Sequence, residues 1–174
     1  IGDFIEHQKY MIEKLGVEVR LNTPVTPELV SEIAPDALIV AIGGVPMRPN
    51  IPGIDGKNVV GVEEAFAKPE LAKGKTVIIG AGRSGTELGI WLKEVYGVDA
   101  SLIEAAPQGD QSKYTAKMAE VGLETKLNTR AKEIKENGIL CDTPDGEQFI
   151  EADTVVLALG VKPLWDEVET LSSF

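Results

Sequence analysis

The sequence predicts an α/β fold in which a parallel β-sheet carries helices on both faces, with a β-hairpin or meander added. Short apolar runs typical of buried strands alternate with stretches of helical periodicity, as at 76–79, 86–93 and 100–103. This alternation favours parallel strands joined by right-handed helical crossovers. A second observation is that pieces of the first half of the chain recur in the second half. Together these observations predict two units of the same type, of which the first is incomplete.

Composition limits the class of protein. The chain has 174 residues, of which 43% are hydrophobic, and a net charge of −11. An acidic chain is repelled by nucleic acid and by anionic membranes, so neither is an expected partner. No apolar run approaches the roughly 20 residues of a membrane-spanning helix. One cysteine, Cys141, and one histidine, His7, exclude an internal disulfide and disfavour a metal site, and they fit a cytoplasmic location.

The first 70 residues contain both helical and strand-like patterns. Thr26 followed by Pro27 is typical of a helix start, with the threonine as N-cap and the proline at the first helical position. A later apolar run ends at Gly43, as a buried strand does. In chain order we expect a helix over 3–15, a strand over 17–21, a helix over 27–33, a buried strand over 37–42 and, after a Pro/Gly-rich crossing, a short helix over 62–68.

A glycine-rich turn follows the strand predicted at 76–79. Its residues are Gly80, Ala81, Gly82, Arg83, Ser84 and Gly85. A helical stretch follows, and the next predicted strand, 100–103, ends in Glu104. Strand, G-x-G-x-x-G, helix, strand and acid in this order are typical of a Rossmann-like dinucleotide site.

Each part of this motif has a physical role. The first glycine permits the tight turn, Gly82 allows the backbone to approach a pyrophosphate, and Gly85 allows the helix to pack against the strand. The free N–H groups and positive dipole end of the helix attract phosphates. Glu104 lies 24 residues after Gly80, where a carboxylate can accept hydrogen bonds from the adenosine ribose. Its charge would repel the 2′-phosphate of NADPH, so we expect NADH to be preferred.

The internal repeat has two matching pieces. Residues 16–23 resemble 122–129, with Leu-Asn-Thr in both, and residues 36–43 resemble 153–160. The second copy carries 11 extra residues between its pieces, within a stretch over 138–150 that is typical of a hairpin around Pro-Asp-Gly. Strands are also expected over 124–127 and 154–159.

The repeat predicts where a first glycine motif would lie. Gly80 precedes Gly122 by 42 residues, and the equivalent motif of the first copy would precede Gly16 by the same interval, ahead of Ile1. We therefore expect a fragment that lacks the phosphate loop of its first unit.

Four pieces of the chain carry a resemblance to a known family, namely Ala-Ile-Gly-Gly-Val-Pro at 41–46, Ile-Pro-Gly-Ile-Asp-Gly at 51–56, the glycine motif with Thr-Glu at 80–87, and Ala-Leu-Gly-Val-Lys-Pro at 158–163. With them the chain resembles the pyridine-nucleotide module of the pyridine nucleotide–disulfide reductase superfamily of flavoproteins. Within it, the resemblance is greatest to the C-terminal flavin/NAD(P) module of old-yellow-enzyme-like NADH:flavin oxidoreductases of the 2-enoate reductase and 2,4-dienoyl-CoA reductase type.

The resemblance implies roles for further residues. Ala158, Leu159 and Gly160 would pass near the nicotinamide half of NAD(P)H, and Glu87 would line the nicotinamide side of the helix. Gly43 would end the strand that approaches FAD. In domain terms, it implies a partial FAD-domain segment over 1–70, an NAD(P)-binding domain over 71–162 and a tail over 163–174 that returns toward the FAD domain.

On this basis we expect an NADH-binding module of a flavin-dependent oxidoreductase. In the parent enzyme NAD(P)H would deliver hydride to FAD, which would pass electrons on to an FMN or an enoate-type acceptor. Its partners would be NADH and the remainder of the parent flavoenzyme. The chain has no residue that we assign to catalysis, and alone it is expected to be inactive and without FAD. Two alternatives stay open: a non-catalytic nucleotide-sensing domain, and a small-molecule methyltransferase, which also pairs a glycine-rich loop with an acid.

Overall fold

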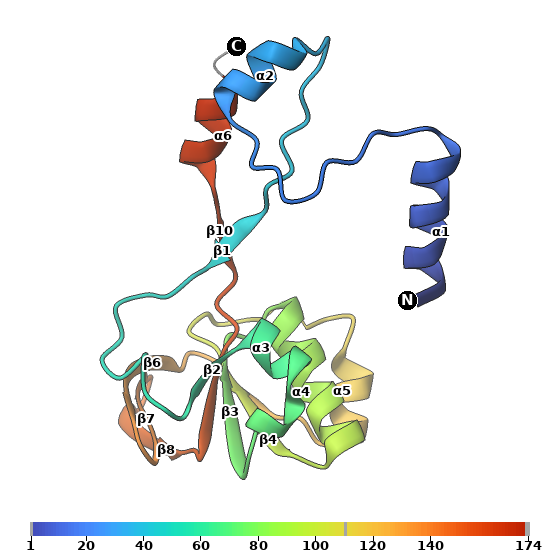
Figure 1. Cartoon of the computed structure of the whole chain (residues 1–174). Helices are drawn as coiled ribbons and strands as arrows, with labels where there is room; N and C mark the ends of the chain where they lie inside the picture. The colour runs from blue at the N-terminus through green and yellow to red at the C-terminus, as the bar shows by residue number, and fades with distance from the viewer. Residues whose placement is uncertain (1, 110, 173–174) are drawn as a thin grey trace. The chain divides into compact units, whose positions relative to one another are not determined.

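The structure is a computed structural model that describes residues 2–109 and 111–172. It divides into two compact units, one formed by Ile1–Ile42 with Leu164–Phe174 and the other by Gly43–Pro163. Residue 1 of the first segment and residues 173–174 of the predicted tail lie outside the described part. Figure 1 labels the helices and strands of both units.

The larger unit is built on a five-stranded parallel sheet of order β2-β9-β3-β4-β5. Its strands, in sheet order, are Val59–Gly61, Thr154–Leu157, Lys75–Ile79, Asp99–Ile103 and Thr125–Lys126. The parallel strands predicted at 76–79, 100–103, 124–127 and 154–159 are thereby confirmed. The three-residue strand β2 was not predicted.

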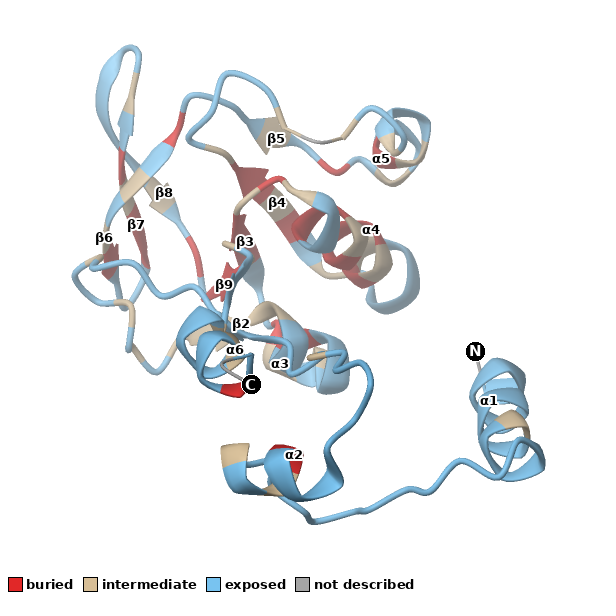
Figure 2. Cartoon of the chain, turned by 90° about the horizontal axis from the view of Figure 1, so that it is seen from above, coloured by how far each residue is buried: buried red, intermediate tan, exposed pale blue. Residues whose placement is uncertain are grey.

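Helices cover one face of this sheet. They are α3 (Val62–Ala67), followed by the short 3₁₀ helix η1 (Pro69–Leu71), α4 (Arg83–Tyr96) and α5 (Thr115–Val121). Their apolar sides share one core with alternate strand residues, among them Ile78, Leu88, Leu102 and Val156. Figure 2 shows the buried positions concentrated on β3, β4 and α4.

An antiparallel meander covers the opposite face. It consists of β6 (Arg130–Lys135), β7 (Gly138–Thr143) and β8 (Gly146–Glu151), which confirms the hairpin expected over 138–150. Ile139 and Cys141 pack there against Val77, Ile79 and Val155. The predicted α/β class is confirmed, with one correction in detail: helices cover one face of the sheet and the meander takes the place of helices on the other. Because both faces are covered, β3 and β9 are buried at successive positions rather than at alternate ones.

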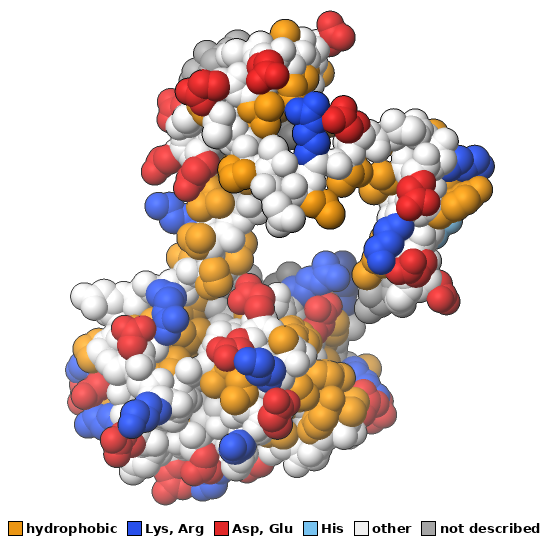
Figure 3. Space-filling view, in the orientation of Figure 1, with side chains coloured by type: hydrophobic (Ala, Val, Ile, Leu, Met, Phe, Trp, Pro, Cys, Tyr) orange, Lys and Arg blue, Asp and Glu red, His pale blue; other side chains and the backbone are white. Residues whose placement is uncertain are grey.

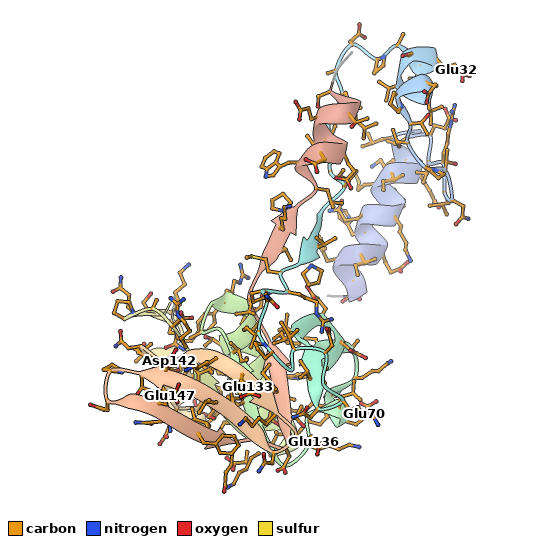
Figure 4. The ribbon with its side chains drawn as sticks, turned by 90° about the vertical axis from the view of Figure 1, so that its left-hand side faces the viewer. Glu32, Glu70, Glu133, Glu136, Asp142 and Glu147 are labelled. Carbon is orange, nitrogen blue, oxygen red and sulfur yellow. The ribbon has the colours of Figure 1, made fainter. Side chains whose placement is uncertain are left out.

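Charged side chains lie on the outside of the larger unit. Figure 4 labels Glu133, Asp142 and Glu147, which lie on the three strands of the meander. Lys132 forms ion pairs with the last two of these. On the face that Figure 3 shows, acidic and basic side chains are intermixed. A two-stranded antiparallel ladder, β1 (Gly44–Pro46) with β10 (Val161–Pro163), completes the unit.

The smaller unit contains the helices predicted near the N-terminus. These are α1 (Gly2–Lys14) and α2 (Pro27–Ile33), and α6 (Trp165–Leu171) joins them from the C-terminal segment. The Leu29 amide donates to the Thr26 side chain at 3.3 Å, and Pro27 occupies the first turn. The start of this helix is therefore confirmed as the sequence predicts it.

Two strands predicted in this segment are wrong. Residues 17–21 and 37–42 have no strand conformation. All of them are exposed except Val40, which is half-buried, and Ile39 is 90% exposed. An apolar strand of a parallel sheet is stable only when neighbouring strands take up its backbone N–H and C=O groups and other layers cover its side chains. The described residues provide no such neighbours for these two runs.

The internal repeat is nevertheless present in the backbone. Gly16 and Gly122 have φ of 65° and 66°, and the non-glycine pair Asn22 and Asn128 have φ of 53° and 51°. After each asparagine, the threonine hydroxyl donates to the carbonyl of the residue before that asparagine, at 3.1 and 3.0 Å. A left-handed conformation is uncommon outside glycine, so its recurrence at matching positions indicates two segments with the same local structure.

Candidate functional site

A groove of about 480 Å³ lies where β3, β4 and β9 end at their carboxyl edge, the usual ligand position in open parallel sheets. It includes most of the residues expected to bind a nucleotide. The lining residues are Val62, Glu63, Gly80, Gly82, Arg83, Ser84, Glu104, Ala158, Leu159, Gly160 and Val161.

Two glycines of the motif allow close packing beneath the groove. Gly80 has φ +108°, and a Cβ atom there would lie 2.4 Å from the carbonyl oxygen of Ala158. A Cβ atom on Gly85 would lie 2.2 Å from the carbonyl oxygen of Gly80. These distances are far shorter than a van der Waals contact, so β3, the first turn of α4 and the segment after β9 approach each other only because side chains are absent.

The middle glycine has a different environment. Gly82 has φ −75° and ψ −174°, and a Cβ atom placed on it would meet no atom within 4 Å. Its outer side therefore faces the open groove. Gly82 is also the N-cap of α4, which has no side-chain cap hydrogen bond. The first-turn amides of α4 are accordingly left for a ligand, and a bound phosphate is the group that such a helix start favours.

Glu104 ends β4 beside the glycine turn, and its carboxylate binds two backbone amides. Oε2 accepts a hydrogen bond from the Ala81 amide at 2.9 Å, and Oε1 accepts one from the Ala106 amide at 2.8 Å. The side chain is half-buried and also lines the groove. Glu104 therefore fixes the turn in place while presenting its negative charge to the groove, a structural role that sequence reasoning missed.

Arg83 and Glu87 form one network on the first two turns of α4. Glu87 accepts hydrogen bonds from the Tyr114 hydroxyl at 2.5 Å and from Arg83 Nε at 3.1 Å. These two donors, the tyrosine first, hold the pKa of the Glu87 carboxyl below its usual value. Among the described residues that line the groove, Arg83 is present and Glu87 is not. The structure thus directs Glu87 toward Tyr114.

The other residues named from the sequence fall into two groups. Ala158, Leu159 and Gly160 line the groove directly after β9, and Ala81 contributes its amide to Glu104. Gly43 precedes β1 with φ +76° and is exposed, and it does not belong to the described residues lining the groove.

Sequence reasoning missed the residues at the end of β2. Val62 and Glu63 line the groove and also a smaller hollow of about 270 Å³ beside it, together with Leu159 and Gly160. They reach the site because β2 pairs in parallel with β9, so both strands end at the same edge. The short run Val59-Val60 before Gly61 is the only local signal, and it is too brief to identify a strand.

The remaining candidates provide no second site. Cys141 is buried in the meander core, and burial raises the pKa of its thiol to about 11, so the thiolate needed for nucleophilic attack is not formed near neutral pH. Within residues 2–109 and 111–172, no group of histidine, cysteine and acidic side chains is placed to hold a metal ion. No helix in that same part of the chain is long and apolar enough to cross a membrane.

Comparison with known proteins gives a family match over nearly the whole chain. The family described as pyridine nucleotide-disulphide oxidoreductase matches residues 5–171. Among curated proteins, cinnamate reductase of Clostridium sporogenes is 26% identical over 173 residues, which cover 91% of this chain and 25% of that protein. NADH oxidase of Thermoanaerobacter brockii is 28% identical over 174 residues, covering 91% of this chain and 26% of that protein.

The solved structures agree. A 2-naphthoyl-CoA reductase in complex with 2-naphthoyl-CoA matches with a TM-score of 0.82 and 28% identity, covering 99% of this chain and 27% of that one. An NAD-dependent persulfide reductase from A. fulgidus matches with a TM-score of 0.60 and 26% identity, covering 75% of this chain and 26% of that one. The chain thus spans about a quarter of the length of these relatives.

Proposed function

The chain belongs to the pyridine nucleotide-disulphide oxidoreductase family, and we propose that it is the NADH-binding module of a flavin-dependent oxidoreductase. One observation carries this proposal: the uncapped start of α4 opens into the groove at Gly82, where a Cβ atom would meet nothing within 4 Å beyond the adjoining residues of the chain. A dinucleotide pyrophosphate has the charge and the hydrogen-bond acceptors that this position requires.

We propose a direction for the bound dinucleotide from the residues that line the groove. The pyrophosphate would lie against the first-turn amides of α4, with Arg83 at its side. The adenosine ribose would lie beside Glu104, and the nicotinamide half would extend along Ala158–Gly160. In this arrangement the glycine turn supplies donors, and Glu104 both orients the turn and disfavours a 2′-phosphate. We therefore propose that NADH is preferred over NADPH.

In the whole enzyme, the bound nicotinamide would supply hydride to FAD, from which electrons pass to an FMN or an enoate-type acceptor. The names of the relatives support this reading, since two of them are reductases named for cinnamate and 2-naphthoyl-CoA and a third is an NADH oxidase. The bounds expected from the resemblance, 1–70 and 71–162, shift because β2 and α3 belong to the unit that carries the groove. We propose that 43–163 is the nucleotide domain and that 1–42 with 164–174 is part of an FAD domain.

The same proposal predicts how the chain behaves alone. Among the described residues 2–42, thirteen large apolar side chains are exposed, and Ile39 is 90% exposed, so the described part of this segment has no further layer that would enclose a flavin. We propose that the 174-residue chain binds no FAD and transfers no hydride without the remainder of the parent flavoenzyme. We place it in the cytoplasm, where a single buried thiol is normal.

A non-catalytic nucleotide-sensing role remains the second candidate, because the groove by itself would serve either role. The methyltransferase alternative gains no support from the family match. Flavin incorporation after joining the chain to its parent protein separates the first two, since only the enzyme module requires FAD.

Calorimetric titration of the 174-residue chain with NADH, NADPH and ADP-ribose tests the proposal. We expect weak binding of NADH and ADP-ribose and still weaker binding of NADPH. Absence of heat from every nucleotide up to millimolar concentrations would contradict the binding role, and equal or tighter binding of NADPH would contradict the preference.

A further inference from the structure

The groove continues past the glycine turn to the end of β2. The main groove and the smaller hollow share Val62, Glu63, Leu159 and Gly160, so they form one continuous depression across the carboxyl edge of the sheet. Along this edge the strands follow the order β4, β3, β9, β2. With about 4.8 Å between neighbouring strands, the depression extends about 14 Å from Glu104 to the end of β2.

Two carboxylates, those of Glu63 and Glu64, line the smaller hollow at this far end, and of the two only Glu63 also lines the main groove. Glu63 is the second residue of α3 and is exposed, and its Oε2 lies 4.0 Å from a Cβ atom placed on Gly61, the last residue of β2. The side chain therefore folds back over the strand end rather than away from it. Of the neighbouring charges, Arg48 is bound to the Ile54 carbonyl and to Asp55, each at 3.1 Å.

The position of Glu63 fixes which part of a dinucleotide it meets. With adenosine at Glu104 and the pyrophosphate at α4, an extended dinucleotide places its nicotinamide end toward β9 and β2. That ring carries a positive charge in NAD⁺ and none in NADH. A carboxylate attracts the cation, and no described residue in the smaller hollow other than Arg48 has a positive charge to offset it.

Resting on the proposed function, we propose that Glu63 is a specificity residue of the nicotinamide end, which raises the affinity for NAD⁺ relative to NADH. The contact is between charges at an exposed position, so its effect is modest and depends on salt. On this proposal, this end of the groove binds NAD⁺, the oxidised product, more tightly than it would without the carboxylate, whereas NADH, the reduced substrate, gains nothing from the charge.

The test measures the ratio of the dissociation constants of NAD⁺ and NADH for the 174-residue chain and for Glu63→Gln. We expect the variant to lose about two- to fivefold in NAD⁺ affinity relative to NADH, with the loss shrinking at high salt, and to keep its ADP-ribose affinity. Glu70→Gln is the matched control: Glu70 lies on η1 in the same unit (labelled in Figure 4), and it does not line either hollow, so the variant removes the same charge away from the site.

The outcomes separate this inference from the proposed function. An unchanged ratio in Glu63→Gln, or an equal loss of ADP-ribose affinity, would overturn the role of Glu63 at the nicotinamide ring while leaving the binding site in place. A change of the same size in Glu70→Gln would also overturn it, because it would reflect net charge alone. Failure of the unmodified chain to bind any of the three nucleotides would overturn the proposed function itself, and this inference with it.

Discussion

Gly82 and Gly85 belong to one motif, but the structure predicts opposite consequences for their replacement by alanine. At Gly85 the added Cβ atom would lie 2.2 Å from the Gly80 carbonyl oxygen and 3.0 Å from the Ala158 Cβ. At Gly82 it would meet nothing within 4 Å, and φ of −75° suits alanine. The first change disturbs the folded chain, whereas the second fills space that only a ligand uses.

The expected magnitudes follow from these contacts. Forcing a methyl group into a packed position costs about 1–3 kcal/mol, which lowers Tm by about 2–12 °C for a chain of this size. Gly82→Ala should change the free energy of unfolding by less than about 1 kcal/mol, since no atom is displaced. It should weaken one or two charge-assisted hydrogen bonds to phosphate, at about 1.5–3 kcal/mol, or about 10- to 100-fold in Kd.

Two measurements on the same three proteins check this reasoning. Thermal unfolding reports stability, and calorimetric titration with ADP-ribose reports binding without any contribution from flavin. We expect Gly82→Ala to unfold as the unmodified chain does and to bind poorly, and Gly85→Ala to unfold at lower temperature. A Gly82→Ala variant that binds ADP-ribose as well as the unmodified chain would refute the placement of the pyrophosphate at this turn.

Three further outcomes are expected. Glu104→Ala should narrow the preference for NADH over NADPH, because the charge that repels the 2′-phosphate is removed; an unchanged NADPH affinity in titrations would contradict this. The same variant should lower the free energy of unfolding by about 1–3 kcal/mol, because two backbone amides lose their acceptor. Glu87 has a lowered pKa, so its contribution to stability is present above the unfolded value near 4.5 and is lost as pH falls through the folded one. The free energy of unfolding of Glu87→Gln should therefore depend less on pH below about pH 5 than that of the unmodified chain. The same pH dependence in both proteins would exclude the network with Tyr114. Cys141, with a pKa of about 11, should resist iodoacetamide at pH 8 in the folded chain and react in denaturant; rapid native alkylation would show that its thiol is accessible.

The larger unit could be predicted well because its signals are local. The run Thr76–Ile79, the glycine motif and the apolar run ending at Glu104 each specify their own conformation, and together they fix a parallel β-α-β unit. The meander was predictable for the same reason, since Pro144-Asp145-Gly146 marks its second turn. In these segments sequence propensity and tertiary structure favour the same conformation.

The errors occur where structure depends on distant partners. The run 37–42 has the same apolar pattern as 154–159, yet only the second becomes a strand, because only it has β2 and β3 on either side. The role of Glu63 depends on β2 pairing with β9, nearly a hundred residues later in the chain. The two amide contacts of Glu104 likewise depend on the folded turn. The sequence predicted that the Glu104 carboxylate lies at the site, but not that it accepts hydrogen bonds from the Ala81 and Ala106 amides.

The proposed function stands on a dinucleotide site at the start of α4, and amide-resolved NMR during titration with NADH measures binding there residue by residue. We expect the largest chemical-shift changes on the amides of Gly82, Arg83 and Ser84, with smaller changes along Ala158–Gly160. The meander amides at 138–151 should not move. Saturable binding of NADH with shifts confined to other parts of the chain, and none at the glycine turn, would contradict it.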